Sequence, residues 1–292
     1  MWIYSDLCRC GSQWVHEVSE RVRQSAHVVA LSTNLCMYVA TAAVYGGQVV
    51  GQAVAASARC VTDKKALHSL HSYFLKGGNP EVPILYHVQR LSVSNNFENH
   101  NIIAKQQGQV IFSCTASYHR PEESTLFHER PMPTAPDPET LMNQEDRLQE
   151  VLLDPRLPER KKQGIMKALE TPFPIDCRVV DPDCFFNPSK QIPRKLVWMK
   201  ARIPLSDAEP NMHRCVAAFN SDWGLCSTSL LPHGISIGSP DLKVSIRFII
   251  DIILLVINMI HTIRLLHHWI MPCGSMPAFE LTSGCCLTCI GK

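Results

Sequence analysis

The sequence has almost no excess of charge of either sign. Its 292 residues carry 28 Lys and Arg against 26 Asp and Glu, which leaves a formal net charge of +2 at pH 7. Domains that bind nucleic acids, or membranes through polybasic surfaces, need a clear excess of positive charge. The composition therefore argues against a nucleic-acid partner, and any anionic ligand must be held by a local group of residues.

The sequence also lacks a disulfide framework, although it contains 13 cysteines. Disulfide-rich secreted domains and structural zinc sites both use closely spaced cysteine pairs. Here only Cys286 and Cys289 have the CxxC spacing, without the second pair that a zinc site needs. Most of the others stand singly: Cys36, Cys60, Cys114, Cys177, Cys184, Cys215 and Cys226. We predict free thiols in a reducing, intracellular compartment, with no metal and no cofactor.

The length and the 46% hydrophobic content fit two units of similar size. The first unit begins with the glycine-led run 46–56, in which Val and Ala recur at helical spacing to about Cys60. Such an apolar helix must be buried on nearly all sides. Segments rich in β-branched and aromatic residues follow it and predict a four-stranded antiparallel meander: 68–75, 83–91, 102–107 and 109–118.

The rest of the chain divides by its composition. Clustered prolines after 120 indicate an extended linker, and a polar helix is predicted at 137–153. A predicted strand at 195–203, an apolar helix at 213–225 and a strand at 241–246 repeat the plan of the first unit. We therefore expect a divergent N-terminal segment (1–44), a first repeat (45–120), a linker with a helix (121–190), the start of a second repeat (191–246) and a divergent, Cys-rich tail (247–292).

The tail opens with a strongly apolar run at 248–260. The sixteen residues between Arg247 and Arg264 would span about 24 Å as a helix, against a hydrocarbon core of roughly 30 Å. Asp251 would add roughly 3 kcal/mol to the cost of insertion. The run therefore favours a buried or interfacial helix, and membrane contact through 247–270 remains an alternative.

Three spaced motifs carry a family resemblance. The runs Gly46-Gly47-Gln48-Val49-Val50-Gly51-Gln52-Ala53, His68-Ser69-Leu70-His71-Ser72-Tyr73-Phe74-Leu75 and Gly78-Asn79-Pro80 closely resemble the first repeat of type II (TesB-like, peroxisomal-type) acyl-CoA thioesterases. The resemblance runs from about Tyr45 to Ile246. It implies an α+β double hot-dog fold, in which each of two repeats wraps an antiparallel sheet around a central helix. The second repeat is expected to be truncated.

Two segments depart from the family pattern. The chain reads Phe97-Glu98-Asn99-His100 where the family usually has an aromatic residue followed by arginine, and the segment before Tyr45 is unlike the family's opening strand. Neither departure removes a position that the family uses in catalysis.

The resemblance implies hydrolysis of fatty acyl-CoA by a water molecule that an Asp, a Ser or Thr, and a Gln hold. Asp222 matches the Asp position and Ser245 the hydroxyl position, while no residue after Ile246 matches the Gln. The carboxylate would accept a proton from the water, and Gly46 and Gly47 could offer backbone donors to the substrate oxygen. The alternative is structural: Asp222 caps the following turn, Ser245 is an ordinary strand serine, and the glycines only form a turn.

Other functions remain open from the sequence. Gly234-Ile235-Ser236-Ile237-Gly238 fits the G-x-S-x-G pattern of serine hydrolases, but Pro232 and Pro240 flank it where a nucleophile elbow needs a strand and a helix. A non-catalytic acyl-CoA-binding or assembly protein, and a membrane-tethered fragment, are the alternative functions. The resemblance suggests a peroxisomal protein and a possible homo-oligomer, although Ile290-Gly291-Lys292 is not a peroxisomal C-terminal tripeptide.

Overall fold

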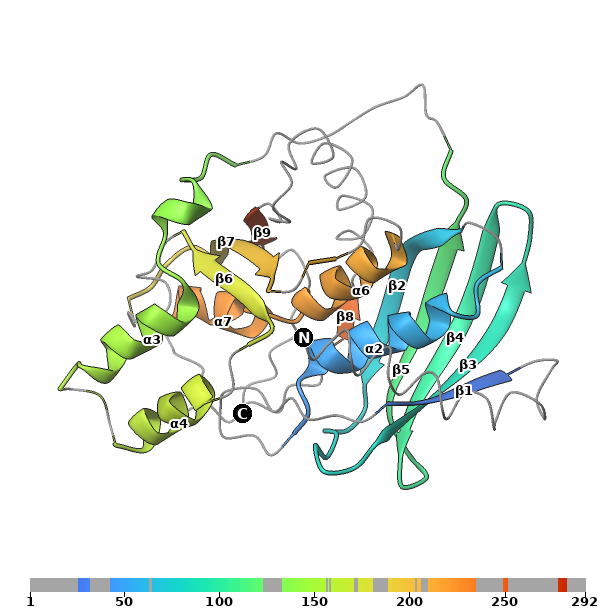
Figure 1. Ribbon diagram of the computed structural model, residues 1–292, viewed down its shortest axis with the longest axis horizontal. Coiled ribbons are helices and arrows are strands. Elements are labelled where there is room, and N and C mark those ends of the chain that lie inside the picture. Colours follow the sequence, from blue (N-terminus) through green and yellow to red (C-terminus); the bar gives the residue numbers. More distant parts are fainter. Residues whose placement is uncertain are drawn as a thin grey trace.

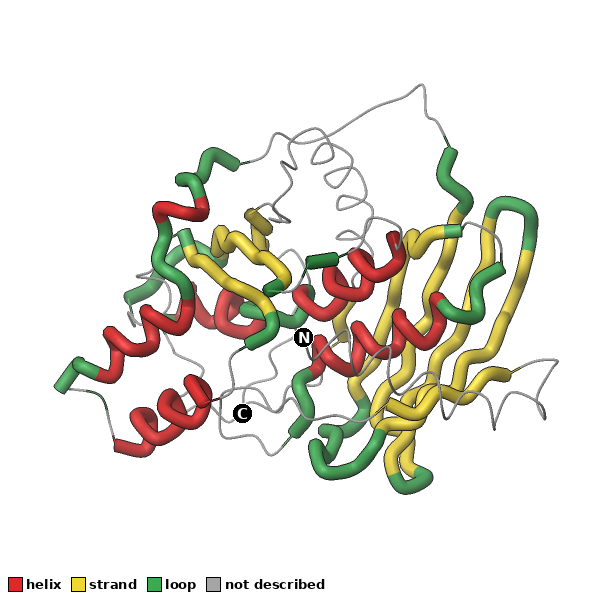
Figure 2. The backbone as a smooth tube through the Cα atoms, in the orientation of Figure 1, coloured by secondary structure: helices red, strands yellow, loops and turns green. Residues whose placement is uncertain are grey.

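The computed structural model contains two antiparallel sheets and two central helices that lie side by side between them (Figure 1). It describes residues 26–31, 43–62, 65–122, 133–155, 157, 159–170, 173–180, 189–202, 204–205, 210–234, 249–251 and 278–282. Figure 2 shows that the strands of the larger sheet cross behind both helices. This is the hot-dog arrangement that the sequence predicts, present twice.

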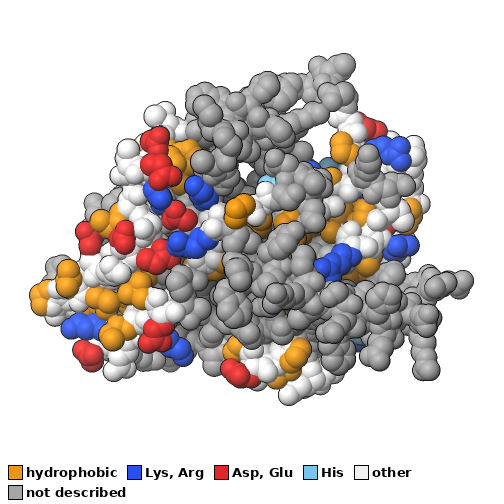
Figure 3. Space-filling view, in the orientation of Figure 1, with side chains coloured by type: hydrophobic (Ala, Val, Ile, Leu, Met, Phe, Trp, Pro, Cys, Tyr) orange, Lys and Arg blue, Asp and Glu red, His pale blue; other side chains and the backbone are white. Residues whose placement is uncertain are grey.

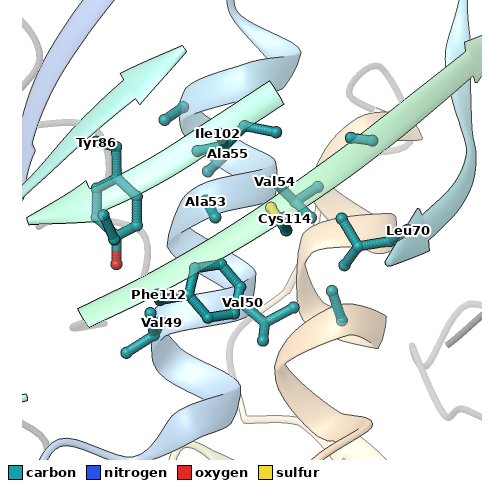
Figure 4. Close-up of a cluster of buried hydrophobic side chains, with 14 of the residues drawn as sticks. Val49, Val50, Ala53, Val54, Ala55, Leu70, Tyr86, Ile102, Phe112 and Cys114 are labelled. Carbon is teal, nitrogen blue, oxygen red and sulfur yellow. The ribbon is translucent and has the colours of Figure 1, made fainter. Parts of the chain in front are cut away.

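Helix α2 (Gly46–Ala58) is the centre of the first repeat. All its residues from Gly47 to Ser57 are buried, as expected for an alanine- and valine-rich helix that a sheet surrounds. Figure 4 shows Phe112, Ile102 and Leu70 among the strand side chains that pack around this helix.

Among the described residues, the first sheet has six strands in the order β1-β3-β4-β5-β2-β8. Their bounds are β1 (Ala26–Leu31), β2 (Ala66–Phe74), β3 (Ile84–Val93), β4 (Phe97–Gln106), β5 (Gln109–His119) and β8 (Ile249–Asp251). The four predicted strands are confirmed, but the predicted meander is wrong in one respect. β2 pairs with β5 instead of its neighbour in sequence, β3, so the connection between β2 and β3 crosses the sheet.

The second repeat has a smaller sheet. Its strands are β6 (Ile175–Val179), β7 (Arg194–Ala201) and β9 (Ala278–Thr282), in the order β6-β7-β9, and helix α6 (Pro210–Asn220) packs against it. A short helix α7 (Leu225–Leu230) and the 3-10 turn η2 (Leu231–His233) follow. β6 lies within the range expected as linker, and β7 and α6 confirm the predicted strand and helix.

The linker between the repeats is more structured than its prolines suggested. It contains the turn η1 (Pro138–Thr140), helix α3 (Gln144–Leu152) and helix α4 (Glu159–Glu170), of which only the first helix was predicted. The linker is fixed to the second sheet because Trp198 donates to the Pro136 carbonyl at 3.0 Å and Arg178 to the Pro138 carbonyl at 2.7 Å.

The tail provides two strands, one of them at the start of the run where the sequence predicted a helix. Ile249–Asp251, inside the apolar run, pairs with β2, and Ala278–Thr282 pairs with β7. A sheet edge offers a row of unpaired backbone groups to any apolar segment near it. In the first residues of 248–260, pairing with such an edge outweighs the helical pattern of the sequence. The rest of the run and the strand predicted at 241–246 lie outside the described residues. Within the described part of the chain, no helix has the length and hydropathy to cross a bilayer.

A buried charged network joins the end of α2 to the sheet, at the position where the sequence departs from the family. Glu98, fully buried, accepts from the backbone and hydroxyl of Thr62 at 3.0 and 2.6 Å and pairs with His100 at 2.9 Å. Lys65 and Arg90 lie 3.7 and 3.6 Å from its carboxylate. Burial alone would raise the pKa of Glu98, but the hydrogen bonds from Thr62 and His100 lower it below its ordinary value.

We predict that Glu98→Gln destabilises the protein by about 3 kcal/mol at pH 7, because it leaves buried cations without their carboxylate. A carboxyl group whose pKa is lowered on folding stabilises the fold above its unfolded pKa of about 4.3, and this stability is lost as the pH falls through the folded pKa. The difference from the native protein should therefore shrink below about pH 4. Urea unfolding at pH 7 and below about pH 4 measures this difference in stability. Glu159→Gln, at an exposed pair with Lys162, is the control and should change little. An equal loss at both pH values would contradict the account.

Candidate active site

The two central helices approach each other closely along a glycine face of α2. A methyl group at Gly47 would overlap the backbone oxygen of Phe219, and one at Gly51 would lie 3.2 Å from that of Cys215. Gly47 and Gly51 are one helical turn apart, so they share the face that meets α6. Cys215 and Ala218 of α6 complete the core under the first sheet, and the pair of helices is therefore common to both repeats.

The beginning of α2 meets the end of α6 at this contact. The backbone N–H of Gly47 donates to the carboxylate of Asp222 at 2.9 Å. Gly46 lies against the same group, since a methyl there would be 2.8 Å from Asp222 Oδ2 and 3.1 Å from the Phe74 ring. The structure thus brings together three residues that the sequence singled out, from positions 175 residues apart.

The carboxyl group of Asp222 has two opposing influences on its pKa. Burial raises the pKa to about 6 from an ordinary value of 3.8, while the Gly47 N–H lowers it. Asp222 is partly exposed at its surface, but protein surrounds most of the carboxyl group. A carboxylate with a pKa near 6 is ionised at pH 7 and basic enough to take a proton from water.

The sequence offered a purely structural role for Asp222 as the cap of the following turn, but the structure gives it a different contact. The residue that caps the following helix, α7, is Gly224, without a side-chain hydrogen bond. Asp222 instead faces the positive end of α2, where unpaired N–H groups and the helix dipole favour an anion. It therefore links the two repeats whatever its chemical role.

Two predicted features lie outside the described residues. These are Ser245, expected to hold the attacking water, and most of the G-x-S-x-G segment 234–238. The structure therefore tests neither. Within the described residues, no three His, Cys, Asp or Glu side chains are grouped so as to hold a metal ion.

Ser57, His100 and Glu98 form a second arrangement that resembles a catalytic triad. Ser57 Oγ lies 2.8 Å from His100 Nδ1, and His100 Nε2 lies 2.9 Å from Glu98. All three side chains are fully buried, and the serine contacts Nδ1, whereas serine-protease triads place the serine at Nε2. These residues anchor α2 to β4 and do not form a site open to a substrate.

Sequence reasoning missed Tyr45 and Phe219. The Tyr45 hydroxyl donates to the Phe219 carbonyl at 3.1 Å, beside the contact between Gly47 and Asp222. The signal in the sequence was an aromatic residue immediately before the glycine pair. Its distant partner could not be found without the fold.

Two sheets, each closed over one side of a pair of central helices, define a protein of the hot-dog fold class. Residues 36–119 match the family described as the acyl-CoA thioesterase N-terminal domain. The chain is 38% identical over 189 residues to rat (Rattus norvegicus) acyl-coenzyme A thioesterase 8, covering 65% of this chain and 59% of that protein. It is 34% identical over 119 residues to the Saccharomyces cerevisiae peroxisomal acyl-coenzyme A thioester hydrolase 1, covering 38% and 34%.

Among solved structures, the tesB protein of Mycobacterium avium subspecies paratuberculosis is similar in fold. It has a TM-score of 0.53 and 19% identity, covering 75% of this chain and 71% of that one. The chain is thus similar to acyl-CoA thioesterases over about two thirds of its length, and the family match lies in the first repeat and the segment just before it. It spans about three fifths of the length of its rat relative.

We predict that Gly47→Ala destabilises the protein by about 3 kcal/mol, because the new methyl group must push α6 away from α2. Gly51→Ala should cost less, since its contact at 3.2 Å can be relieved by a small shift. Gly164→Ala, in α4 with nothing within 4 Å, is the control and should stabilise by roughly 0.5–1 kcal/mol. Denaturant unfolding gives all three values. A Gly47→Ala protein as stable as the native one would mean that the helices are not in this contact.

Proposed function

We propose that this protein hydrolyses fatty acyl-CoA thioesters to free fatty acid and CoA, using a water molecule that Asp222 activates. The observation that carries the proposal is the position of Asp222. A carboxyl group with a raised pKa lies against the first turn of α2, whose N–H groups can also stabilise negative charge. Relatives that are named as acyl-CoA thioesterases support the choice of substrate.

The chemistry assigns each group a step. Ionised Asp222 accepts a proton from water as the water oxygen attacks the thioester carbon. Negative charge develops on the former carbonyl oxygen, and the N–H groups at Gly46 and Gly47 stabilise it. The C–S bond then breaks, and the CoA sulfur leaves with the proton. In the free protein the Gly47 N–H is engaged by Asp222, so the substrate oxygen must displace or share that contact.

Further parts of the proposal concern groups beyond this contact. Ser245 would hold the attacking water together with Asp222, as the family pattern implies. Figure 3 shows acidic and basic side chains intermixed over α3 and α4, so the described residues there form no single-sign patch for an anion. The phosphates of CoA would then be bound by individual groups.

The name of the yeast relative supports a peroxisomal location.

We predict that kcat/KM falls as the pH drops through about 6, because protonated Asp222 cannot act as a base. Asp222→Asn should lower the rate about 100-fold or more at pH 7.5. Release of CoA from a medium-chain acyl-CoA, detected with a thiol reagent, measures both. An unchanged rate in the mutant would remove Asp222 from the mechanism. A native chain that binds acyl-CoA without releasing CoA would instead favour the non-catalytic binding function.

The stability of Asp222→Asn provides a control that does not depend on activity. A carboxyl group whose pKa is raised on folding destabilises the fold as the pH rises from its unfolded to its folded pKa. Asp222→Asn should therefore stabilise the protein above pH 6, by roughly 2 kcal/mol, and have no effect below about pH 4. This result would establish that lost activity does not reflect lost folding.

A fluorophosphonate probe separates this mechanism from a serine hydrolase at Ser236. Only a serine nucleophile forms a covalent acyl-enzyme and reacts with the probe. We expect no labelling of the native chain and no change in turnover in Ser236→Ala. Ser245→Ala should slow turnover, because the water loses one of its holders. Stoichiometric labelling that disappears in Ser236→Ala would refute the general-base mechanism.

A further inference from the structure

Tyr45 connects the start of the first repeat's helix to the core of the second repeat. It precedes Gly46 as the N-cap residue of α2, but its ring packs in the second core. The ring makes edge contacts with Phe173 and Phe219, with centroids 5.8 and 5.0 Å away. It folds back over Gly47, where an added methyl group would lie 2.6 Å from a ring carbon. Gly47 is thus needed for Tyr45 to reach α6.

The Tyr45 hydroxyl is bound to a backbone oxygen at the end of α6. It donates to the Phe219 carbonyl at 3.1 Å in a buried position. The last carbonyls of a helix lack partners within it. Here the N–H of Trp223, which would bond Phe219 if the helix continued, donates to Asn220 at 2.9 Å instead. Tyr45 therefore supplies the Phe219 carbonyl with the partner that Trp223 would provide in a continuing helix.

Two adjacent contacts hold the helix ends together. The Tyr45 hydroxyl fixes the carbonyl of Phe219, and two residues later along α2 the Gly47 N–H meets Asp222, three residues beyond Phe219. Because the two acceptors are only three positions apart in the chain, a shift at Phe219 moves Asp222 directly. Hydrogen bonds of this kind are directional, so the hydroxyl sets the position of α6 along α2 as well as its distance.

We propose that Tyr45 is a positioning residue that uses its hydroxyl to place Asp222 against the first turn of α2. This proposal rests on the proposed hydrolase function for its kinetic consequence, but not for its structural one. The aromatic ring packs in the second core, and the hydroxyl fixes the position of α6 along α2. A phenylalanine would keep the packing and lose the hydrogen bond that fixes this position.

The test compares Tyr45→Phe with Tyr86→Phe. Tyr86 is also buried, and its hydroxyl donates to Gln52 of the same helix at 2.9 Å, away from the contact with α6. Both variants lose one buried hydrogen bond and should lose similar stability. We expect kcat to fall about 10-fold in Tyr45→Phe, with KM within twofold of native, since misplacing a catalytic group affects the chemical step. Tyr86→Phe should keep the native kcat and KM. Equal kcat in the two variants would overturn the proposal.

A second measurement is independent of turnover. Selective carbon-13 labelling of aspartate carboxyl groups allows the titration of Asp222 to be followed by NMR, with Asp222→Asn providing the assignment. The midpoint should shift in Tyr45→Phe and stay at the native value in Tyr86→Phe. If the native chain shows no hydrolysis but this shift is seen, the proposed function fails and the role of Tyr45 stands. If hydrolysis is present but neither kcat nor the titration responds to Tyr45→Phe, the role of Tyr45 fails and the proposed function stands.

Discussion

The close contact between α2 and α6 is the constraint on which the rest of the structure depends. It joins the two repeats through the face of α2 that carries Gly47 and Gly51. Because these residues have no side chain, the backbone of α6 can approach α2 directly. Each sheet then closes over one side of the helix pair, and the two cores share residues from both repeats. The same approach delivers Asp222 to the first turn of α2. Packing and the candidate chemistry therefore have one cause.

The contact also explains why Asp222 combines a cost in stability with the chemistry proposed for it. A buried carboxylate is unfavourable unless donors compensate for the water it has lost. One backbone N–H compensates in part, and the pKa still rises to about 6. A fully satisfied carboxylate, such as Glu98 with its several partners, is held ionised and is a poor base. The pKa values of these two acidic residues shift in opposite directions, and this difference separates the candidate site from the structural network.

Local pattern was enough to predict the elements that bury apolar residues continuously. The valines and alanines of α2 and the alternating residues of β2 to β5 needed no knowledge of the fold. The family resemblance identified Asp222 as a candidate, and the glycine-led start of the helix suggested Gly46 and Gly47. Pairing between distant segments could not be predicted in the same way. The position of β2 beside β5, the addition of β8 and β9 from the tail, and the bond from Tyr45 to Phe219 depend on which segments meet after folding. Glu98 and His100 looked like a mere departure from the family, because their burial and their partners are properties of the folded state.

The central claim is that the contact between α2 and α6 is the place where a thioester is bound. A crystal structure of the protein with an acyl-CoA analogue that has a methylene group in place of the thioester sulfur would test it most directly. The account predicts that the ketone oxygen of the analogue lies at the first turn of α2, within hydrogen-bonding distance of the Gly47 N–H, and that Asp222 has moved off this donor to face the ketone carbon. An analogue bound elsewhere, with the bond between Gly47 and Asp222 intact, would contradict it.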